Sequence, residues 1–206
     1  FNGYDFKTGE DESVGWLVGV AYQIPEIALK ASVTYRAEIE HKMNAYENFG
    51  STAIENNPLN PVISTITSTN SETKLTTPQS INIDFQTGIM ANTVAFANVR
   101  WVDWSKFKVQ PYQFGKLSQY LGQNNLVPNK PNGFNLIDYK EDQISATVGV
   151  GRKFNERWGG NVSVGWDSGA GNPVTTLGPT EGFWSVGTGV RFSPAENYFI
   201  GAGVKY

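Results

Sequence analysis

The stretch from Leu29 to Glu40, LKASVTYRAEIE, alternates between apolar and polar side chains along its whole length. Successive side chains of a β-strand point to opposite faces, so the pattern predicts a strand with one apolar and one polar face. Either a protein core or the lipid of a membrane must cover the apolar face.

The same period of two residues recurs along the chain and predicts eight strands joined in four hairpins. Turns of three to five residues, rich in Asn, Pro and Glu, are ordinary hairpin connections. The expected pairs are 14–22 with 29–40, 80–90 with 94–104, 143–154 with 158–167, and 182–192 with 198–206.

Much longer connections, rich in Asn, Ser, Thr, Pro and Gly, separate these hairpins. They cover residues 43–79, 110–141 and 168–181, and a short helix is expected at 114–123. Short turns at one end of the strands and long loops at the other are the layout of an outer-membrane β-barrel. The long loops are therefore expected at the extracellular end and the short turns at the periplasmic end.

Aromatic residues bracket the apolar side of several predicted strands. The bracketing pairs are Trp158 and Trp166, Trp184 and Phe192, and Tyr198 and Tyr206. An interval of eight residues spans about 26 Å of strand, or roughly 20 Å of height in a tilted strand, which approaches the apolar band of a barrel with aromatic girdles. A soluble sandwich does not need rings at matched heights, so lipid is the expected cover.

Composition narrows the possible functions. The 206 residues carry a net charge of −3, contain no cysteine and have one histidine, His41. A nucleic-acid partner lacks electrostatic support, cysteine chemistry lacks its side chain, and serine–histidine chemistry has only the single histidine to use. The sequence has no run of about 18 apolar residues, so no transmembrane helix is predicted. We expect no catalytic residue, metal or cofactor, and we interpret His41 as a solvated or capping residue.

Three segments resemble the long-chain fatty acid transporters of the bacterial outer membrane, the FadL family. The most specific pieces are TYRAEIE, the strand entry PQSINIDF with the later WVDWSKF, and GPTEGFWSVGTGVRF. Their order and spacing match the later part of such a protein, strands six to thirteen of fourteen. One loop departs from the family pattern: DSGAGNPV stands at 167–174 where relatives often carry an Asp-Ser-Pro-Val-Pro-like stretch.

The resemblance implies an all-β fold, a fragment of about eight strands of an antiparallel transmembrane β-barrel, with residues 1–206 in one domain. It further implies a monomer in the bacterial outer membrane, in contact with lipid and lipopolysaccharide, that takes up long-chain fatty acids or other hydrophobic compounds. Aromatic hydrocarbons are included for some relatives. The family's N-terminal plug, first strands and last strand are expected outside this sequence.

Two arginines are candidates for receiving the carboxylate of a ligand, because parity places Arg36 and Arg100 on the polar face. Each also has a structural interpretation. A three-residue turn at 91–93 would put Asp84 directly opposite Arg100, where the pair would stabilise the sheet. Glu38 and Glu40 could pair with Arg36. The same parity places Val150 opposite Val162 on the apolar face.

Further candidates lie in the long connections. Lys140 is a possible partner for a carboxylate head group, while Phe107 and Phe134 could line an entry groove for an apolar ligand. These rings could equally form the small core that folds a long loop. A soluble β-rich ligand-binding or adhesive domain remains the alternative function. An outer-membrane enzyme is the weakest hypothesis, because no serine–histidine–aspartate spacing is found.

Overall fold

The computed structural model describes residues 4–49, 69–171, 181–195 and 197–206, which belong to two compact units. The smaller unit consists of Phe1–Val14, Glu38–Thr77 and Lys106–Asp138. The larger unit consists of Gly15–Ala37, Pro78–Ser105 and Tyr139–Tyr206.

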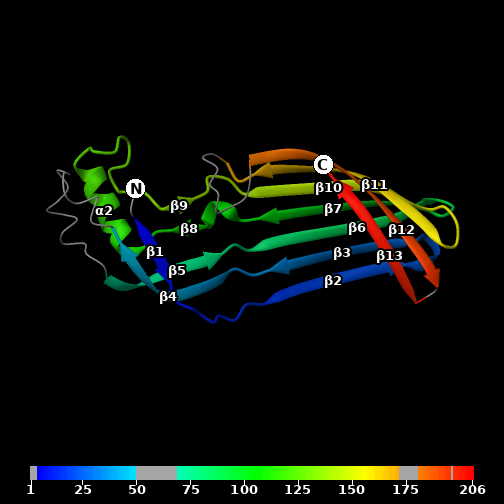
Figure 1. Ribbon diagram of the computed structural model, residues 1–206, viewed down its shortest axis with the longest axis horizontal. Coiled ribbons are helices and arrows are strands. Elements are labelled where there is room, and N and C mark those ends of the chain that lie inside the picture. The colour runs from blue at the N-terminus through cyan, green and yellow to red at the C-terminus, as the bar shows by residue number, and fades with distance from the viewer. Residues whose placement is uncertain (1–3, 50–68, 172–180, 196) are drawn as a thin grey trace. The chain divides into compact units, whose positions relative to one another are not determined.

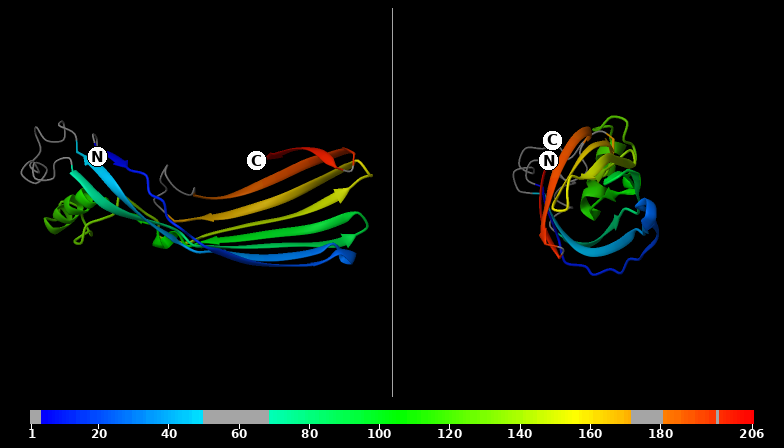
Figure 2. Two further views of the ribbon diagram at one scale, coloured as in Figure 1. Left: turned by 90° about the horizontal axis from the view of Figure 1, so that it is seen from below. Right: turned by 90° about the vertical axis from the view of Figure 1, so that its right-hand side faces the viewer.

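The larger unit is an eight-stranded antiparallel sheet with the strand order β13-β12-β11-β10-β7-β6-β3-β2 (Figure 1). The sheet is curved, and its edge strands β2 and β13 do not pair with each other, so it does not close into a barrel (Figure 2). The strands are β2 (Leu17–Ile24), β3 (Leu29–Arg36), β6 (Ser80–Met90), β7 (Thr93–Val102), β10 (Gln143–Lys153), β11 (Trp158–Gly169), β12 (Glu181–Ala195) and β13 (Tyr198–Lys205).

All eight strands predicted from the alternating pattern are present, and the expected hairpin partners pair antiparallel. The short 3-10 helix η1 (Pro25–Ile27) forms the first turn, and another, η3 (Trp104–Lys106), follows β7. The predicted strand at 29–40 is wrong in one respect. It ends at Arg36, and a new strand begins at Ile39 in the smaller unit.

The predicted pairing of Asp84 with Arg100 is wrong. Asp84 lies opposite Asn98, and Arg100 lies opposite Asn82. The turn has two residues rather than three, with Asn92 in the left-handed conformation at φ 57°, and a β-bulge lies between Gly88 and Met90. Together these features shift the partners by two residues, which changes the pairs but leaves every side chain on its predicted face.

The apolar face of this sheet is the one that carries Trp184. Val150 lies opposite Val162 there, as predicted, and Trp166 lies opposite Trp184. At the other end of the strands the rings of Trp158 and Phe192 pack with centroids 4.6 Å apart. Large side chains on this face are open, with Trp184 73% exposed, so no core within the described residues covers them.

The described residues of the smaller unit form a three-stranded sheet, β1-β4-β5, a two-stranded sheet and one α-helix. The expectation that 43–79 is only a loop is wrong at both ends, because β4 and β5 pair there, whereas 50–68 lie outside the described residues. The helix predicted at 114–123 is confirmed. The elements are β1 (Asp5–Thr8), β4 (Ile39–Asn48), β5 (Thr69–Thr77), β8 (Lys108–Val109), α2 (Tyr112–Gln123) and β9 (Ile137–Asp138).

The core of the smaller unit forms where α2 packs its apolar side. Phe114, Leu117 and Leu121 from the helix cluster with Phe49. Glu47, which has no exposed surface, accepts hydrogen bonds from the peptide nitrogens of Gln113 and Phe114, both at 2.8 Å. A carboxylate there satisfies donors that the first turn of a helix cannot satisfy itself and interacts favourably with the helix dipole.

Candidate functional site

The polar face of the eight-stranded sheet, opposite the face that carries Trp184, holds the sequence-predicted arginines. Its side chains are mostly small or polar. Across β10, β11 and β12 they include Ser145, Thr147, Gly149, Gly151, Asn161, Ser163, Gly165, Ser185, Gly187 and Gly189. Side chains of this kind leave room above the sheet and can be wetted by water, so this face suits the inner wall of a channel.

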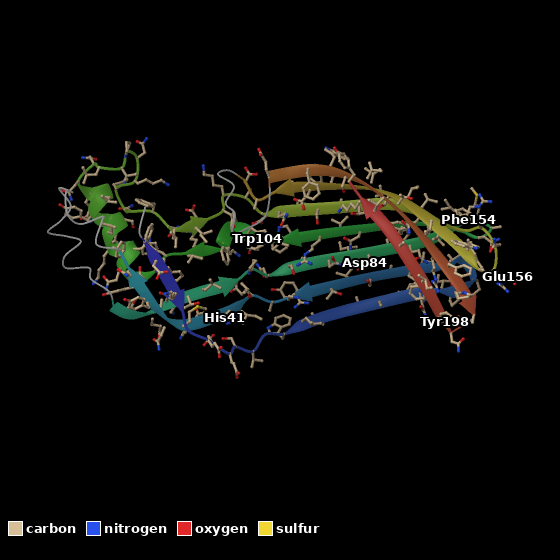
Figure 3. All side chains as sticks on the ribbon, viewed as in Figure 1. His41, Asp84, Trp104, Phe154, Glu156 and Tyr198 are labelled. Atoms are coloured by element: carbon tan, nitrogen blue, oxygen red, sulfur yellow. The ribbon has the colours of Figure 1, made fainter. Side chains whose placement is uncertain are left out.

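Asp84 is the centre of a hydrogen-bonded group on this face (Figure 3). Its carboxylate accepts hydrogen bonds from the amide nitrogens of Asn82 and Asn98 at 2.6 and 2.7 Å. The hydroxyl of Ser32 lies at the limit of hydrogen-bond distance, 3.5 Å. The Asp84 carboxylate is therefore solvated by amide groups rather than paired with an arginine.

Arg100 lies between Asn82 on β6 and Ser145 on β10. Arg36 is the last residue of β3 and lies opposite Ser80. Both side chains are exposed, and within the described part of the chain neither forms an ion pair. The interpretation that Glu40 neutralises Arg36 gains no support, because the Glu40 carboxylate lies 3.6 Å from Lys42 and 3.8 Å from Lys74.

A row of side-chain hydrogen bonds follows the ends of the strands that lead into the longer connections. The amide of Gln143 donates to both carboxylate oxygens of Asp167, at 2.9 and 3.0 Å, and accepts from the indole of Trp104 at 2.9 Å. The amide of Gln79 donates to Asp103 at 2.7 Å and accepts from Tyr35. These contacts link the ends of β3, β6, β7, β10 and β11 at one rim of the sheet. They fix the positions from which the connections leave the sheet.

A large hollow lies against the opposite end of the polar face, at the short turns. Its volume is about 1970 Å³. The wall includes Phe96, whose ring lies so close to Gly149 that an added Cβ would come within 2.3 Å of it. Five lining residues are Lys or Arg and two are Glu, so positive charge dominates around this hollow.

The remaining predicted site residues do not gather at one place on this face. Lys140 is exposed beside Glu141 and Gly171. Phe134 packs edge-on against Phe114, with ring centroids 5.6 Å apart, in the core of the smaller unit. Phe107 belongs to the same unit and is half-buried. The structure therefore gives Phe134 a packing role, and ligand contact by the loop aromatics stays a prediction.

His41 contacts a carboxylate rather than standing free in solvent. Its Nδ1 lies 3.1 Å from Asp11 Oδ2, and both side chains are about four-fifths buried. The hydrogen bond from the Ser13 hydroxyl, together with His41, holds the pKa of Asp11 below its ordinary value. The pair braces the smaller unit by joining Asp11, which precedes β4, to His41 on β4.

Among the described residues, no group of three or more His, Cys, Asp or Glu side chains is placed to hold a metal ion. In the same part of the chain, no helix combines the length and the apolar composition needed to cross a membrane.

Residues 3–159 match the family model described as outer membrane protein transport protein, OMPP1/FadL/TodX. The chain belongs to this family. Its place is therefore in the bacterial outer membrane, and the resemblance seen in the TYRAEIE and WVDWSKF segments is confirmed. Among curated proteins, no sequence matches the chain.

Two solved structures share the fold of this OMPP1/FadL/TodX chain. The CymD monoaromatic hydrocarbon channel is 14% identical with a TM-score of 0.51, and the match covers 94% of this chain and 46% of CymD. The toluene transporter TbuX of Ralstonia pickettii is 14% identical with a TM-score of 0.50, over 94% of this chain and 42% of TbuX. The chain thus spans less than half the length of either neighbour.

Two features of this site had no clear signal in the sequence. The bulge at Gly88 that moves Asp84 away from Arg100 depends on how the turn closes, and alternation alone does not reveal it. The glycines of the polar face are visible in the sequence, but only the strand register shows that they lie side by side across β10 to β13.

Proposed function

We propose that the complete protein takes up hydrophobic compounds passively across the outer membrane, and that this chain forms part of the channel wall. The observation that carries the proposal is the two-sided sheet in a member of an outer-membrane transport family. One face exposes Trp, Val and Ile side chains suited to lipid, and the other has small and polar side chains suited to a water-filled lumen.

Long-chain fatty acids are the substrate class we favour within this function. Arg36 and Arg100 are exposed cations on the polar face without an ion pair in the described part of the chain. An ionised carboxylate meeting such a guanidinium can form two charge-assisted hydrogen bonds. An uncharged ligand cannot form these charge-assisted hydrogen bonds with the guanidinium.

Monoaromatic hydrocarbons are the second candidate substrate class. The two structural neighbours are described as a monoaromatic hydrocarbon channel and a toluene transporter. Toluene carries no charge, so its passage would depend on apolar surface and on space rather than on Arg36 or Arg100.

Uptake by vesicles containing the complete protein distinguishes these possibilities. Radiolabelled palmitate and toluene are offered separately, and vesicles without protein supply the background. We expect both compounds to enter faster than background. Arg36→Ala should slow palmitate by at least about tenfold while toluene is unaffected, since a charge-assisted hydrogen bond is worth roughly 1.5–3 kcal/mol. Background rates for both compounds would refute the proposed function. Equal slowing of both would assign Arg36 a structural role.

A further inference from the structure

Arg152 is an exception on the apolar face of the eight-stranded sheet. It continues the alternation of Val148 and Val150 along β10, and it lies opposite Gly160 on β11 and Thr93 on β7. Among the strand residues that the structure describes, it is the only charged side chain on this face. A charge on a surface that meets lipid costs free energy unless it finds a polar partner.

The chain itself supplies no such partner within its described part. The Arg152 side chain is exposed, and among the described residues it forms neither an ion pair nor a side-chain hydrogen bond. The five donors of its guanidinium are therefore open to a group from outside the protein.

Arg152 lies just inside a row of aromatic rings at the end of the sheet where the strands join through short turns. In this row Trp158 on β11 lies opposite Phe192 on β12, and the peptide nitrogen of Phe154 donates to the Trp158 oxygen at 2.8 Å. Gly160, the partner of Arg152, is two residues from Trp158, or about 7 Å along the strand. Rings on the outer face of a barrel mark the level of the lipid head groups. An arginine side chain is long enough to cover this distance, so the guanidinium can reach the head-group level.

The surface around Arg152 has an aromatic side and an aliphatic side. The ring of Phe154, at the turn end of β10, lies over Gly160, where an added Cβ would meet its Cε2 at 3.0 Å (Figure 3). Towards the middle of the strands, Val150 and Val162 lie opposite each other and are 39% and 59% exposed. The cation therefore stands between rings suited to a head group and aliphatic side chains suited to acyl chains.

Other charges at this end of the sheet also favour an anion. Four further Lys or Arg residues line the hollow at the short turns, against the two carboxylates of Glu26 and Glu156. None of the carboxylates belongs to a strand of the apolar face, so none competes for Arg152 on its own side of the sheet. Net positive charge at this end attracts a phosphate towards Arg152.

We propose that Arg152 binds the phosphate of a bilayer phospholipid on the outer surface of the wall. The guanidinium donates charge-assisted hydrogen bonds to the phosphate oxygens, the head group lies at the level of Trp158 and Phe192, and the acyl chains lie over Val150 and Val162. The short turns are expected at the periplasmic end, so the lipid belongs to the periplasmic leaflet. The site rests on the outer-membrane location of the family and not on the proposed uptake function.

The test compares two lipids with the same oleoyl chains, dioleoyl-phosphatidylglycerol and dioleoylglycerol, which lacks the phosphate. Native mass spectrometry of the complete protein in detergent measures the apparent affinity of each lipid. We expect Arg152→Gln to bind the phospholipid at least about tenfold more weakly and dioleoylglycerol as the wild type does, because only the phosphate uses the guanidinium. Arg152→Lys, which keeps the charge, should retain part of the lost affinity.

Lys153→Gln supplies the matched control, because it removes the same charge from the next residue, on the polar face. Its phospholipid affinity should equal that of the wild type. The proposal is overturned if Arg152→Gln binds the phospholipid normally, if it loses both lipids equally, or if Lys153→Gln has the same effect. Lipid A is offered as a third ligand, and an effect of Arg152→Gln on lipid A alone would also overturn the proposal by assigning the site to lipopolysaccharide.

Discussion

Glu47→Ala should release the first turn of α2 from β4. The buried carboxylate accepts three hydrogen bonds, from Gln113 N and Phe114 N at 2.8 Å and from the Tyr4 hydroxyl at 2.9 Å. Pro111 precedes the helix, and no side chain of its own caps it. The substitution leaves these donors without their acceptor in a buried place, and the expected loss of local stability is about 2–4 kcal/mol.

Hydrogen exchange followed by mass spectrometry, on the complete protein in detergent micelles, measures this loss directly. Peptides from α2 should exchange roughly thirty- to nine-hundred-fold faster in Glu47→Ala, whereas peptides from β10 and β11 should be unchanged. Glu40→Ala is the matched control, because this carboxylate lies on the same strand but is half exposed beside lysines. Its effect should stay within about 1 kcal/mol. Equal exchange of α2 in both variants would refute the anchoring role.

Three shorter predictions concern the sheet and the half-buried Tyr4. Gly149→Ala should lower the free energy of unfolding by about 1–3 kcal/mol, seen as unfolding at a lower temperature in SDS, because the added Cβ would enter the space of the Phe96 ring. Gly151→Ala should leave the unfolding temperature unchanged, because its nearest contact would be at 3.5 Å. Val162→Arg should destabilise the protein in urea by about 2–4 kcal/mol if its face meets lipid, and Ser163→Arg, on the other face, by far less. Burial, with the Glu47 hydrogen bond, raises the pKa of Tyr4 above its ordinary value of 10.0. The stability that the protonated tyrosine contributes below pH 10.0 should therefore fall as the pH rises above that value. Tyr4→Phe should remove this part of the alkaline loss of stability, together with the late step in absorbance at 295 nm that reports ionisation of the tyrosine.

The eight long strands could be predicted from the sequence because a period of two residues determines both the strand and its two faces. Trp184 and Val162 were placed on the correct face for this reason, and short hairpins kept each strand beside its expected partner. The family could also be recognised from the sequence, since segments such as TYRAEIE carry its pattern. These features depend on local sequence, which a single chain displays fully.

The smaller unit was harder to predict from the sequence because its contacts join distant segments of the chain. β4 pairs with β5 across more than twenty residues of chain, and neither strand alternates as cleanly as LKASVTYR. Glu47 gave no signal of its own, since its role depends on a helix 66 residues further along. The neighbours of Gly159, which are Lys153 on β10 and Arg191 on β12, likewise follow only from the strand register.

The bulge at Gly88 and the two-residue turn after Met90 have a consequence for how such walls can diversify. Together they change which residues face each other by two positions, yet no side chain moves from one face to the other. A hairpin that lengthens or shortens in such paired steps can bring a new partner to Asp84 or Arg100 without placing a charge in the bilayer. Natural variation among relatives should therefore favour compensated changes at hairpin ends, which would give this wall a way to acquire new ligand preferences while its lipid-facing surface is conserved.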